Sequence, residues 1–518
     1  MPPKEGMCRT CCRGVYSCHW SRRNDGRRRC TCCWFSAVAM VSLLAASWLY
    51  VCMMAFNDRD DFNWKAFESL KRWVNWFMVM VAVYAAIAIY CCLLLLFALF
   101  QEAMRDPVDP HCVHKVFLSL AVLLITAGIV GMSCRWADEW HTVYLSLLAT
   151  GPFLQLGGVV ALTVLCGFVF QRFFKAKRAV SKTIIMATFV VLTAAVFLSP
   201  LFIKSPCLLE VLPAKPALIG HRGAPMLAPE NTMMSFRRSA DCGVDTFETD
   251  VLISKDGTPF LMHDTTLQRT TDVSEKFPDR ANHTSTSFTW MELQSLNAGR
   301  WFLKSNPFRT LSLLSERERA AAGNQSIPSL AELLELAKER NASLIFDMKD
   351  GDSAGDDTRL VVDTILKSGI RRELVLWLPP KHRAHAQTRG FRQIYSNVSA
   401  MLSDGGNLLN LKYNSVSTEE LRELKRKNVT VNMWVVNDRW LFSLLWCAGV
   451  DSVTTNACHD LQKMDRPDWH LTPSTYRIIW ISVDVASLVI MLIVFYMQRR
   501  TRERIFCPRD RGTPLLEL

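Results

Sequence analysis

Charge is scarce along much of this chain: 21% of its 518 residues are charged, half are hydrophobic, and the mean hydropathy is positive. That balance is unusual for a purely soluble protein. Apolar runs of about 20 residues are long enough to cross roughly 30 Å of hydrocarbon. Six such runs occur, at residues 34–56, 76–100, 117–134, 143–170, 184–203 and 478–497. We therefore expect six transmembrane helices, five within residues 34–203 and one at residues 477–497.

The first apolar run lacks the small-residue cleavage pattern of a signal peptide and is too long to be one, so we interpret it as a retained anchor. Acidic residues are absent from the loop at 171–182, which contains five Lys and Arg, and the segments 1–33 and 498–518 are also basic. Short loops rich in Lys and Arg face the cytosol. We therefore expect both termini in the cytosol and residues 204–476 on the outer side of the plasma membrane.

These basic segments and the loop at 101–115 together carry a net charge of about +13, against +12 for the whole chain, so the rest of the chain is about neutral. The charge thus indicates contact with anionic membrane lipids and no binding of nucleic acid. The apolar runs contain few charged residues, Asp484 being the main one, which argues against a transporter.

Residues 204–476 contain more N-glycosylation sequons than chance would place there, which favours passage through the secretory pathway. The acceptors are Asn282, Asn324, Asn341, Asn397 and Asn428. Seven of the 18 cysteines precede the first span without the regular pairs of a zinc module. Acylation beside the membrane is our preferred interpretation of them, and a zinc site is the alternative. Four more could form disulfides of unknown pairing: Cys207, Cys242, Cys447 and Cys458.

Residues 204–476 have the size and the alternation of strand and helix patterns expected of one α/β TIM barrel. The eight expected parallel strands lie at residues 217–222, 246–251, 259–264, 344–349, 374–378, 408–413, 429–436 and 452–455, and helices are predicted at 329–339, 360–368 and 418–427. Residues 264–328 are too many for an ordinary connection. We expect them to form an insertion after the third strand, over the mouth of the barrel.

Polar groups end four successive predicted strands, at the edge where a parallel barrel collects its catalytic residues. These groups are His221, Arg222, Glu248, Asp250, His263, Asp347 and Lys349, with Glu230 following the first strand. Any one of them alone would be an ordinary structural residue. Their conjunction predicts an active site.

Three of these residues are candidate metal ligands. Glu248 and Asp250 point to the same face of one strand, and two carboxylates so placed repel each other unless a cation neutralises them. With Asp347 they offer hard oxygen ligands, which favour Ca²⁺, with Mg²⁺ as the alternative.

The motifs of this region resemble the signature of the glycerophosphodiester phosphodiesterase family over most of residues 215–460. They are His221-Arg-Gly, Pro229-Glu-Asn-Thr, Glu248-Thr-Asp-Val, Asp256-Gly and His263-Asp. The resemblance implies that His221 and His263 act as general acid and base and that Glu248 and Asp250 hold the metal. The six predicted spans resemble the family's multi-pass branch, most closely its members that act on glycerophosphoinositol.

Some positions depart from the family pattern or fit it loosely. Asp347 stands where Glu is common, and Asn456 stands where an acid is common, which puts metal preference and rate in question. Trp434 resembles an aromatic residue that the family places near the substrate, and ordinary packing of the barrel is the alternative for it.

The chemistry of phosphodiester cleavage fits these residues. It needs a deprotonated nucleophile, a protonated leaving oxygen and neutralised phosphate charge. One histidine would serve each proton transfer, without an indication of which serves which. Arg222, Lys349 and the metal would offset the phosphate charge, while Glu230 would orient Arg222 or a histidine.

The predicted function is therefore metal-dependent hydrolysis of glycerophosphoinositol to inositol phosphate and glycerol at the cell surface. Glycerophosphocholine is an alternative substrate, and so is the glycosylphosphatidylinositol (GPI) anchor of surface proteins, cleaved as by a phospholipase. A catalytically silent receptor or scaffold is the alternative from a different class, and the presence of both histidines and both carboxylates argues against it. The sequence indicates no oligomeric state.

Overall fold

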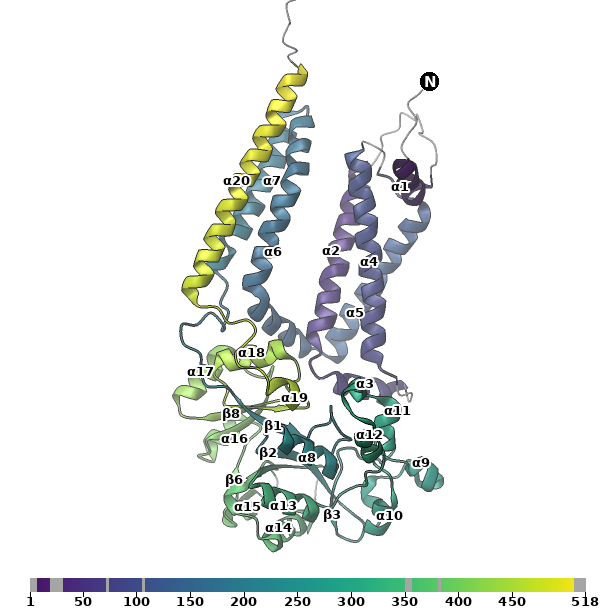
Figure 1. Cartoon of the computed structure of the whole chain (residues 1–518), viewed down its shortest axis with the longest axis vertical. Coiled ribbons are helices and arrows are strands. Elements are labelled where there is room, and N and C mark those ends of the chain that lie inside the picture. Colours follow the sequence, from purple (N-terminus) through teal and green to yellow (C-terminus); the bar gives the residue numbers. More distant parts are fainter. Residues whose placement is uncertain are drawn as a thin grey trace, which may run out of the picture.

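The computed structural model describes residues 7–18, 31–70, 74–104, 108–349, 356–380 and 383–506. Long helices lie at one end of the molecule and an α/β barrel at the other (Figure 1). The short helix α1 (Met7–Ser17) and the end of α20 (Pro473–Phe506) both lie at the end remote from the barrel. Part of the N-terminal cysteine cluster, Cys30 included, and most of the basic tail lie outside the described residues.

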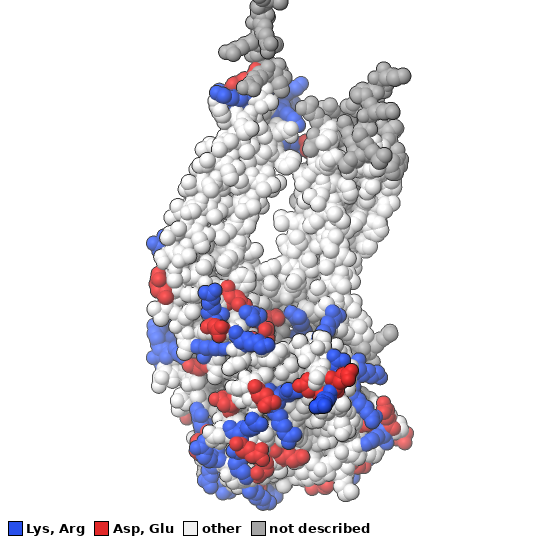
Figure 2. Space-filling model, in the orientation of Figure 1, with Lys and Arg blue, Asp and Glu red and all other residues white. Residues whose placement is uncertain are grey.

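Six described helices are long and apolar enough to cross a membrane, and they coincide with the six predicted apolar runs. One bundle contains α2 (Thr31–Ala55), α4 (Trp76–Ala103) and α5 (Cys112–Arg135), and the other contains α6 (Glu139–Lys175), α7 (Ala179–Leu198) and α20 (Figure 1). Figure 2 shows Lys, Arg, Asp and Glu gathered on the barrel and at the far helix ends, with almost none between. We refer to these helices, with α3 (Arg59–Leu70) and the connections between them, as the membrane domain.

The barrel is one sheet of eight parallel strands. Their order in space is β6-β5-β4-β2-β1-β9-β8-β7. A parallel bridge between Tyr395, which follows β6, and Leu409 of β7 links the two ends of this order. The strands are β1 (Ala217–His221), β2 (Thr246–Ile253), β4 (Ser343–Met348), β5 (Val375–Trp377), β6 (Arg392–Gln393), β7 (Leu408–Lys412), β8 (Thr430–Trp434) and β9 (Ser452–Thr455). The predicted TIM-barrel fold is confirmed.

One predicted barrel strand is wrong. Residues 259–264 contain β3 (Pro259–Leu261), which pairs antiparallel with β2 and lies off the barrel path. Only the tight turn between Ser254 and Thr258 separates these two strands, and parallel neighbours need a crossover of a dozen or more residues. The missing barrel strand is β6, whose two residues are too few to show a periodic pattern.

Helices cover the outside of the barrel. They are α8 (Met233–Asp241), α13 (Leu330–Arg340), α14 (Asp356–Ser368), α15 (Arg383–Thr388), α16 (Val398–Ser403), α17 (Thr418–Arg426), α18 (Arg439–Ala448) and α19 (Cys458–Leu461). The three predicted helices correspond to α13, α14 and α17. The capping box that predicted α13 is present, since the Ser329 hydroxyl accepts from the Glu332 N–H and the Glu332 carboxylate from the Ser329 N–H.

The segment between β3 and α13 forms a helical insertion. It contains α9 (Val273–Lys276), α10 (Trp290–Ser295), α11 (Arg300–Ser305) and α12 (Glu316–Gly323). Phe288 and Leu293 pack with Phe260 of β3 in a core of their own. The insertion is thus fixed on the β2–β3 hairpin.

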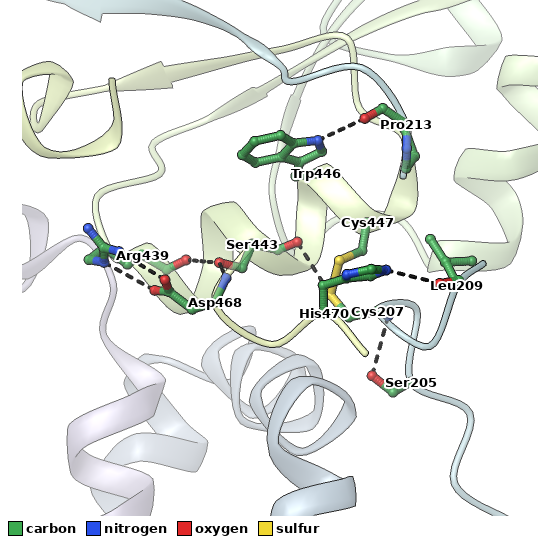
Figure 3. Close-up of a disulfide and its surroundings, with 10 residues drawn as sticks. All are labelled: Ser205, Cys207, Leu209, Pro213, Arg439, Ser443, Trp446, Cys447, Asp468 and His470. Carbon is green, nitrogen blue, oxygen red and sulfur yellow. Dashed lines mark hydrogen bonds and ion pairs between the residues drawn. A yellow bond between two sulfur atoms is a disulfide. The ribbon is translucent and has the colours of Figure 1, made fainter. Parts of the chain in front are cut away.

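Figure 3 shows the contacts of the segment that follows α7 with the barrel and with the segment that precedes α20. Cys207 forms a disulfide with Cys447 of α18. Beside it, His470 Nε2 lies 2.9 Å from the backbone oxygen of Leu209. Cys242 and Cys458, also considered for disulfides, are free thiols.

Candidate active site

A cavity of about 490 Å³ lies at the carboxyl ends of the barrel strands. The lining includes all nine side chains predicted for catalysis, substrate binding and metal binding: His221, Arg222, Glu230, Glu248, Asp250, His263, Asp347, Lys349 and Trp434. His263 follows β3 rather than a barrel strand, and the antiparallel hairpin still brings it to the same cavity. The structure thus brings together every residue of the predicted site.

The His221-Arg-Gly motif forms the turn that leaves β1. Arg222 has φ +53° and Gly223 has φ +88°, in the left-handed region that favours glycine. A Cβ at Gly223 would lie 2.5 Å from the Ser235 hydroxyl and 2.8 Å from the backbone nitrogen of Phe236. Only glycine therefore lets this turn pack against α8, where the Ser235 hydroxyl donates to the Arg222 carbonyl at 2.9 Å.

Three carboxylates form a candidate metal centre. Glu248, Asp250 and Asp347 each offer an oxygen, and these oxygens lie within 4.8 Å of one another. Asp250 and Asp347 are register partners on β2 and β4, which is why residues 97 positions apart meet. Burial and the charge of Asp250 raise the pKa of Glu248 to about 8. A hard divalent cation fits this oxygen set, because it would offset the repulsion that raises that pKa.

Two cations of the chain already lie on these carboxylates. Lys349 Nζ is 3.1 Å from Asp250 Oδ1 and 2.5 Å from Asp347 Oδ2, and Arg222 Nε is 3.2 Å from Asp250 Oδ2. Burial alone would raise the pKa of Asp250, but Arg222 and Lys349 outweigh it and hold that pKa well below its usual range. Asp250 is therefore ionised whether or not Glu248 is.

The two histidines have different partners. His221 Nδ1 lies 2.7 Å from the amide oxygen of Asn456, and its Nε2 is 4.0 Å from the Glu248 carboxylate. His263 Nδ1 lies 2.8 Å from the Asp264 carboxylate. Burial and the neighbouring Arg222 lower the pKa of His221 to about 3. One ring is thus oriented by a neutral amide and the other by a buried carboxylate.

Glu230 binds two arginines. Its carboxylate accepts from Arg222 at 3.0 Å and from Arg269 at 2.6 and 2.8 Å. Burial would raise the pKa of Glu230, but the two guanidinium groups lower it to about 2. The predicted contact with Arg222 is present, and Glu230 reaches His263 only indirectly, because Arg269 also donates to Asp264 at 2.7 Å.

Trp434 stands at the end of β8 with its indole N–H donating to the Asn410 carbonyl at 3.3 Å. The side chain lines the cavity and remains 37% exposed. Both predicted readings, a substrate contact and barrel packing, are compatible with this position. The five sequon asparagines, Asn282, Asn324, Asn341, Asn397 and Asn428, are all exposed.

Sequence reasoning missed two parts of the site. Arg269 lies in the insertion, where no periodicity or motif indicated that it joins Asp264 to Glu230. The cavity also has a wall from the membrane domain, to which α3, its preceding turn and the start of α6 contribute. The residues of this wall are Asp58, Asp61, Trp64, Lys65 and Glu139. Their role in the cavity depends on long-range packing, for which the sequence gives no local signal.

Comparison with known proteins agrees with the geometry. A family model described as the glycerophosphoryl diester phosphodiesterase family matches residues 221–375, and a second with the same description matches 430–457. The chain is 42% identical over 500 residues to the glycerophosphoinositol inositolphosphodiesterase GDPD2 of Mus musculus, covering 94% of this chain and 93% of that protein. It is 40% identical to the glycerophosphodiester phosphodiesterase domain-containing protein 5 of Homo sapiens, covering 95% and 84%.

Solved structures of bacterial enzymes are also similar. A phosphodiesterase of Oleispira antarctica in complex with the product sn-glycerol-3-phosphate is 22% identical, with a TM-score of 0.40, and covers 48% of this chain and 95% of that one. A putative glycerophosphoryl diester phosphodiesterase of Silicibacter pomeroyi is 20% identical, with a TM-score of 0.41, and covers 48% and 94%.

The barrel, its cavity and the family match define this chain as a phosphoric diester hydrolase with a TIM-barrel catalytic domain. Given 42% identity over nearly the whole length of a curated relative, the chain belongs to the glycerophosphodiester phosphodiesterase family.

Proposed function

We propose that the chain is a divalent-metal-dependent enzyme of the plasma membrane that hydrolyses glycerophosphoinositol to inositol phosphate and glycerol. The observation that carries this proposal is one cavity in which two histidines lie beside a cluster of three carboxylates. The name of the mouse relative supports the substrate. The basic flanks and the exposed sequons support a barrel on the outer side of the membrane.

The phosphate would lie at the carboxylate cluster. Glu248, Asp250 and Asp347 would hold the cation, Ca²⁺ by preference or Mg²⁺, which when bound offsets charge on the phosphate. Arg222 and Lys349 lie at the same cluster and would donate to the remaining phosphate oxygens. The cation that the carboxylates would hold, together with Arg222 and Lys349, would offset the charge of a dianionic transition state.

The hydrogen-bond partners of the two histidines support one division of the acid and base roles. His263, whose ring is oriented through Nδ1 by the Asp264 carboxylate, would be the acid that gives its proton to the departing alkoxide. The amide oxygen of Asn456 accepts the Nδ1–H of His221 and leaves Nε2 with a free lone pair. His221 would therefore be the base that takes a proton from the attacking water, whose oxygen bonds to phosphorus while the bond from phosphorus to the glycerol oxygen breaks.

A second candidate substrate is a diester attached to the membrane, such as a GPI anchor. The membrane domain forms one wall of the cavity, which favours a substrate presented from the membrane side. Glycerophosphocholine is a third candidate, because the phosphate-binding side of the cavity does not depend on the head group.

The test uses intact cells that make the wild type, His221→Ala, His263→Ala or the control His283→Ala, an exposed histidine outside the cavity. Cells receive glycerophosphoinositol or glycerophosphocholine, and the released products are identified. Each cavity variant should lower the rate by about a thousandfold, and the control should match the wild type. Wild-type rates no higher than those of the cavity variants, at equal surface expression, would reject the enzyme and favour the silent receptor.

Three further measurements separate the finer points. Loss of activity on chelation and its selective return with Ca²⁺ or Mg²⁺ identifies the cation. Release of a GPI-anchored reporter that depends on both histidines identifies the membrane-attached substrate. A change in gel mobility on removal of N-glycans, made smaller by Asn282→Gln or Asn341→Gln, supports the outer position of the barrel.

A further inference from the structure

One wall of the catalytic cavity belongs to the membrane domain, and that wall is held in place. The Asn57 side chain, just before α3, accepts hydrogen bonds from the backbone N–H groups of Asn437 and Asp438 at 2.9 and 3.0 Å. The same side chain donates to the carbonyl of Val435. The turn that leads into α3 is thus attached to the loop that follows β8.

Trp64 of α3 contacts a charged residue of the catalytic network. The guanidinium carbon of Arg269 lies 5.3 Å from the centre of the Trp64 ring and 5.6 Å from that of Trp301 in α11. Aromatic faces attract a guanidinium at such distances. Arg269 is therefore held by indole rings of two different domains, and its side chain is only 4% exposed.

The N–H groups of the same guanidinium donate to the carboxylate of Asp264, which contacts His263. Arg269 Nε donates to Asp264 Oδ2 at 2.7 Å and Nη2 donates to Asp264 Oδ1 at 3.0 Å. Asp264 in turn lies 2.8 Å from His263 Nδ1. His263 is more exposed than Asp264, so its orientation depends on this carboxylate and on what fixes it.

We propose that Trp64 is a positioning residue for His263, acting through Arg269 and Asp264. The membrane domain is then part of the catalytic machinery, because it fixes the orientation of a proton donor that belongs to the barrel. The inference rests on the proposed function. It goes further in assigning a catalytic contribution to a residue between the first two spans.

The kinetic test uses the purified full-length protein with Trp64→Ala, Trp64→Phe and the control Leu70→Ala, a 56% exposed residue of the same helix outside the cavity. For glycerophosphoinositol, Trp64→Ala should lower kcat about tenfold and change KM by less than about twofold, because the ring orients a catalytic group without binding substrate. Trp64→Phe should restore kcat to within about threefold of the wild type, since an aromatic face remains. Leu70→Ala should match the wild type.

A double-mutant cycle separates positioning from a general structural role. If Trp64 acts through Asp264, Trp64→Ala should cause no further loss of kcat in the Asp264→Asn protein. Independent, multiplicative losses would overturn the inference, and so would an unchanged kcat in Trp64→Ala itself.

Hydrogen exchange gives a readout that does not need activity. Amide exchange in residues 263–272 should be faster in Trp64→Ala than in the wild type or Leu70→Ala, with exchange in the barrel strands unchanged. Equal exchange in all three proteins would overturn the inference. A wild type that hydrolyses neither diester would reject the proposed function, while this measurement would still decide whether Trp64 holds the His263 segment.

Discussion

The two walls of the catalytic cavity each carry an ion-paired group of side chains, and these two groups differ in exposure to solvent. On the barrel wall, Arg222 forms ion pairs with both Glu230 and Asp250, and all three side chains are 13% exposed or less. On the membrane-domain wall, Asp61 and Lys65 form a pair 2.7 Å apart on one face of α3, with 44% and 47% of each side chain exposed.

This difference in exposure implies that ion pairs on the two walls differ in strength. Buried charges interact strongly because little water screens them, whereas an exposed pair on a helix contributes only about 0–1 kcal/mol. Strand register also fixes the barrel residues, as the pairing of Asp250 with Asp347 shows. We therefore expect the barrel wall to supply the reacting groups and the membrane-domain wall to position them and to control access to the cavity.

The largest effect should come from an aspartate of the barrel wall compared with one of the other wall. Asp250→Asn removes the charge that faces Arg222 and Lys349 and one candidate metal ligand, so kcat/KM should fall at least about a hundredfold. Asp61→Asn should change kcat/KM by less than about threefold, because that pair is solvated. Steady-state kinetics on the purified proteins checks both, and equal losses would remove the distinction between the walls.

The next effect concerns metal affinity and pH. The pKa of Glu248 is raised to about 8, so below that pH the carboxyl carries a proton that a cation must displace. Ca²⁺ affinity should rise by up to about tenfold per pH unit between pH 6 and 8 and then level off. Glu248→Gln should bind the cation more weakly and lose this dependence. Calorimetric titration at pH 6, 7 and 8 measures it, and a flat wild-type profile would contradict the assignment.

The same raised pKa has a consequence for stability. Without metal, folded Glu248 holds its proton up to a higher pH than the unfolded chain does. Its contribution to stability is therefore present below the ordinary pKa of a glutamate and is lost as the pH rises towards 8.

The barrel and its carboxylates could be predicted from the sequence because they depend on local patterns. An apolar run ending in a polar group indicates a strand of a parallel barrel, and Glu248-Thr-Asp places two acids on one face whatever the rest of the fold does. Strand β6 is only two residues long, and β3 has the composition of a barrel strand although it turns back on β2. For these two strands the pairing partner, and not the pattern, decides the structure.

Arg269 and Trp64 could not be predicted for a different reason. Arg269 acts through contacts with the segments of Asp264, Glu230 and Trp64, and the last of these is more than 200 residues away in the chain. Nothing local to a tryptophan between two apolar runs indicates that it will contact the network of a distant histidine. Long-range packing creates that part of the site.

A smaller effect is expected from the neutral partner of His221. Asn456→Asp would place a carboxylate at Nδ1, which favours the imidazolium and raises the pKa of His221. Since His221 must be neutral to act as the base, the acidic limb of the pH–rate profile should move up by about one unit. The profile of kcat/KM from pH 3 to 7 measures the shift, because the pKa of His221 starts from about 3. The matched variant Asn410→Asp changes another amide of the cavity and should leave that limb in place.

The smallest effect should come from Asn57, whose side chain attaches the membrane-domain wall to the loop after β8. Asn57→Ala removes the acceptor of two backbone N–H groups, at Asn437 and Asp438, and the donor to the carbonyl of Val435. Each buried polar group that loses its hydrogen-bond partner destabilises the folded state by about 1–3 kcal/mol. The loop after β8 should therefore open more often, while the strands stay intact. Activity should fall only about threefold, because no group of the barrel wall is changed. Hydrogen exchange that rises at residues 435–438, with kcat/KM nearly retained, would show that the barrel wall works largely without this attachment. A loss as large as that of Asp250→Asn would instead show that the membrane domain controls the chemistry as well as the shape of the cavity.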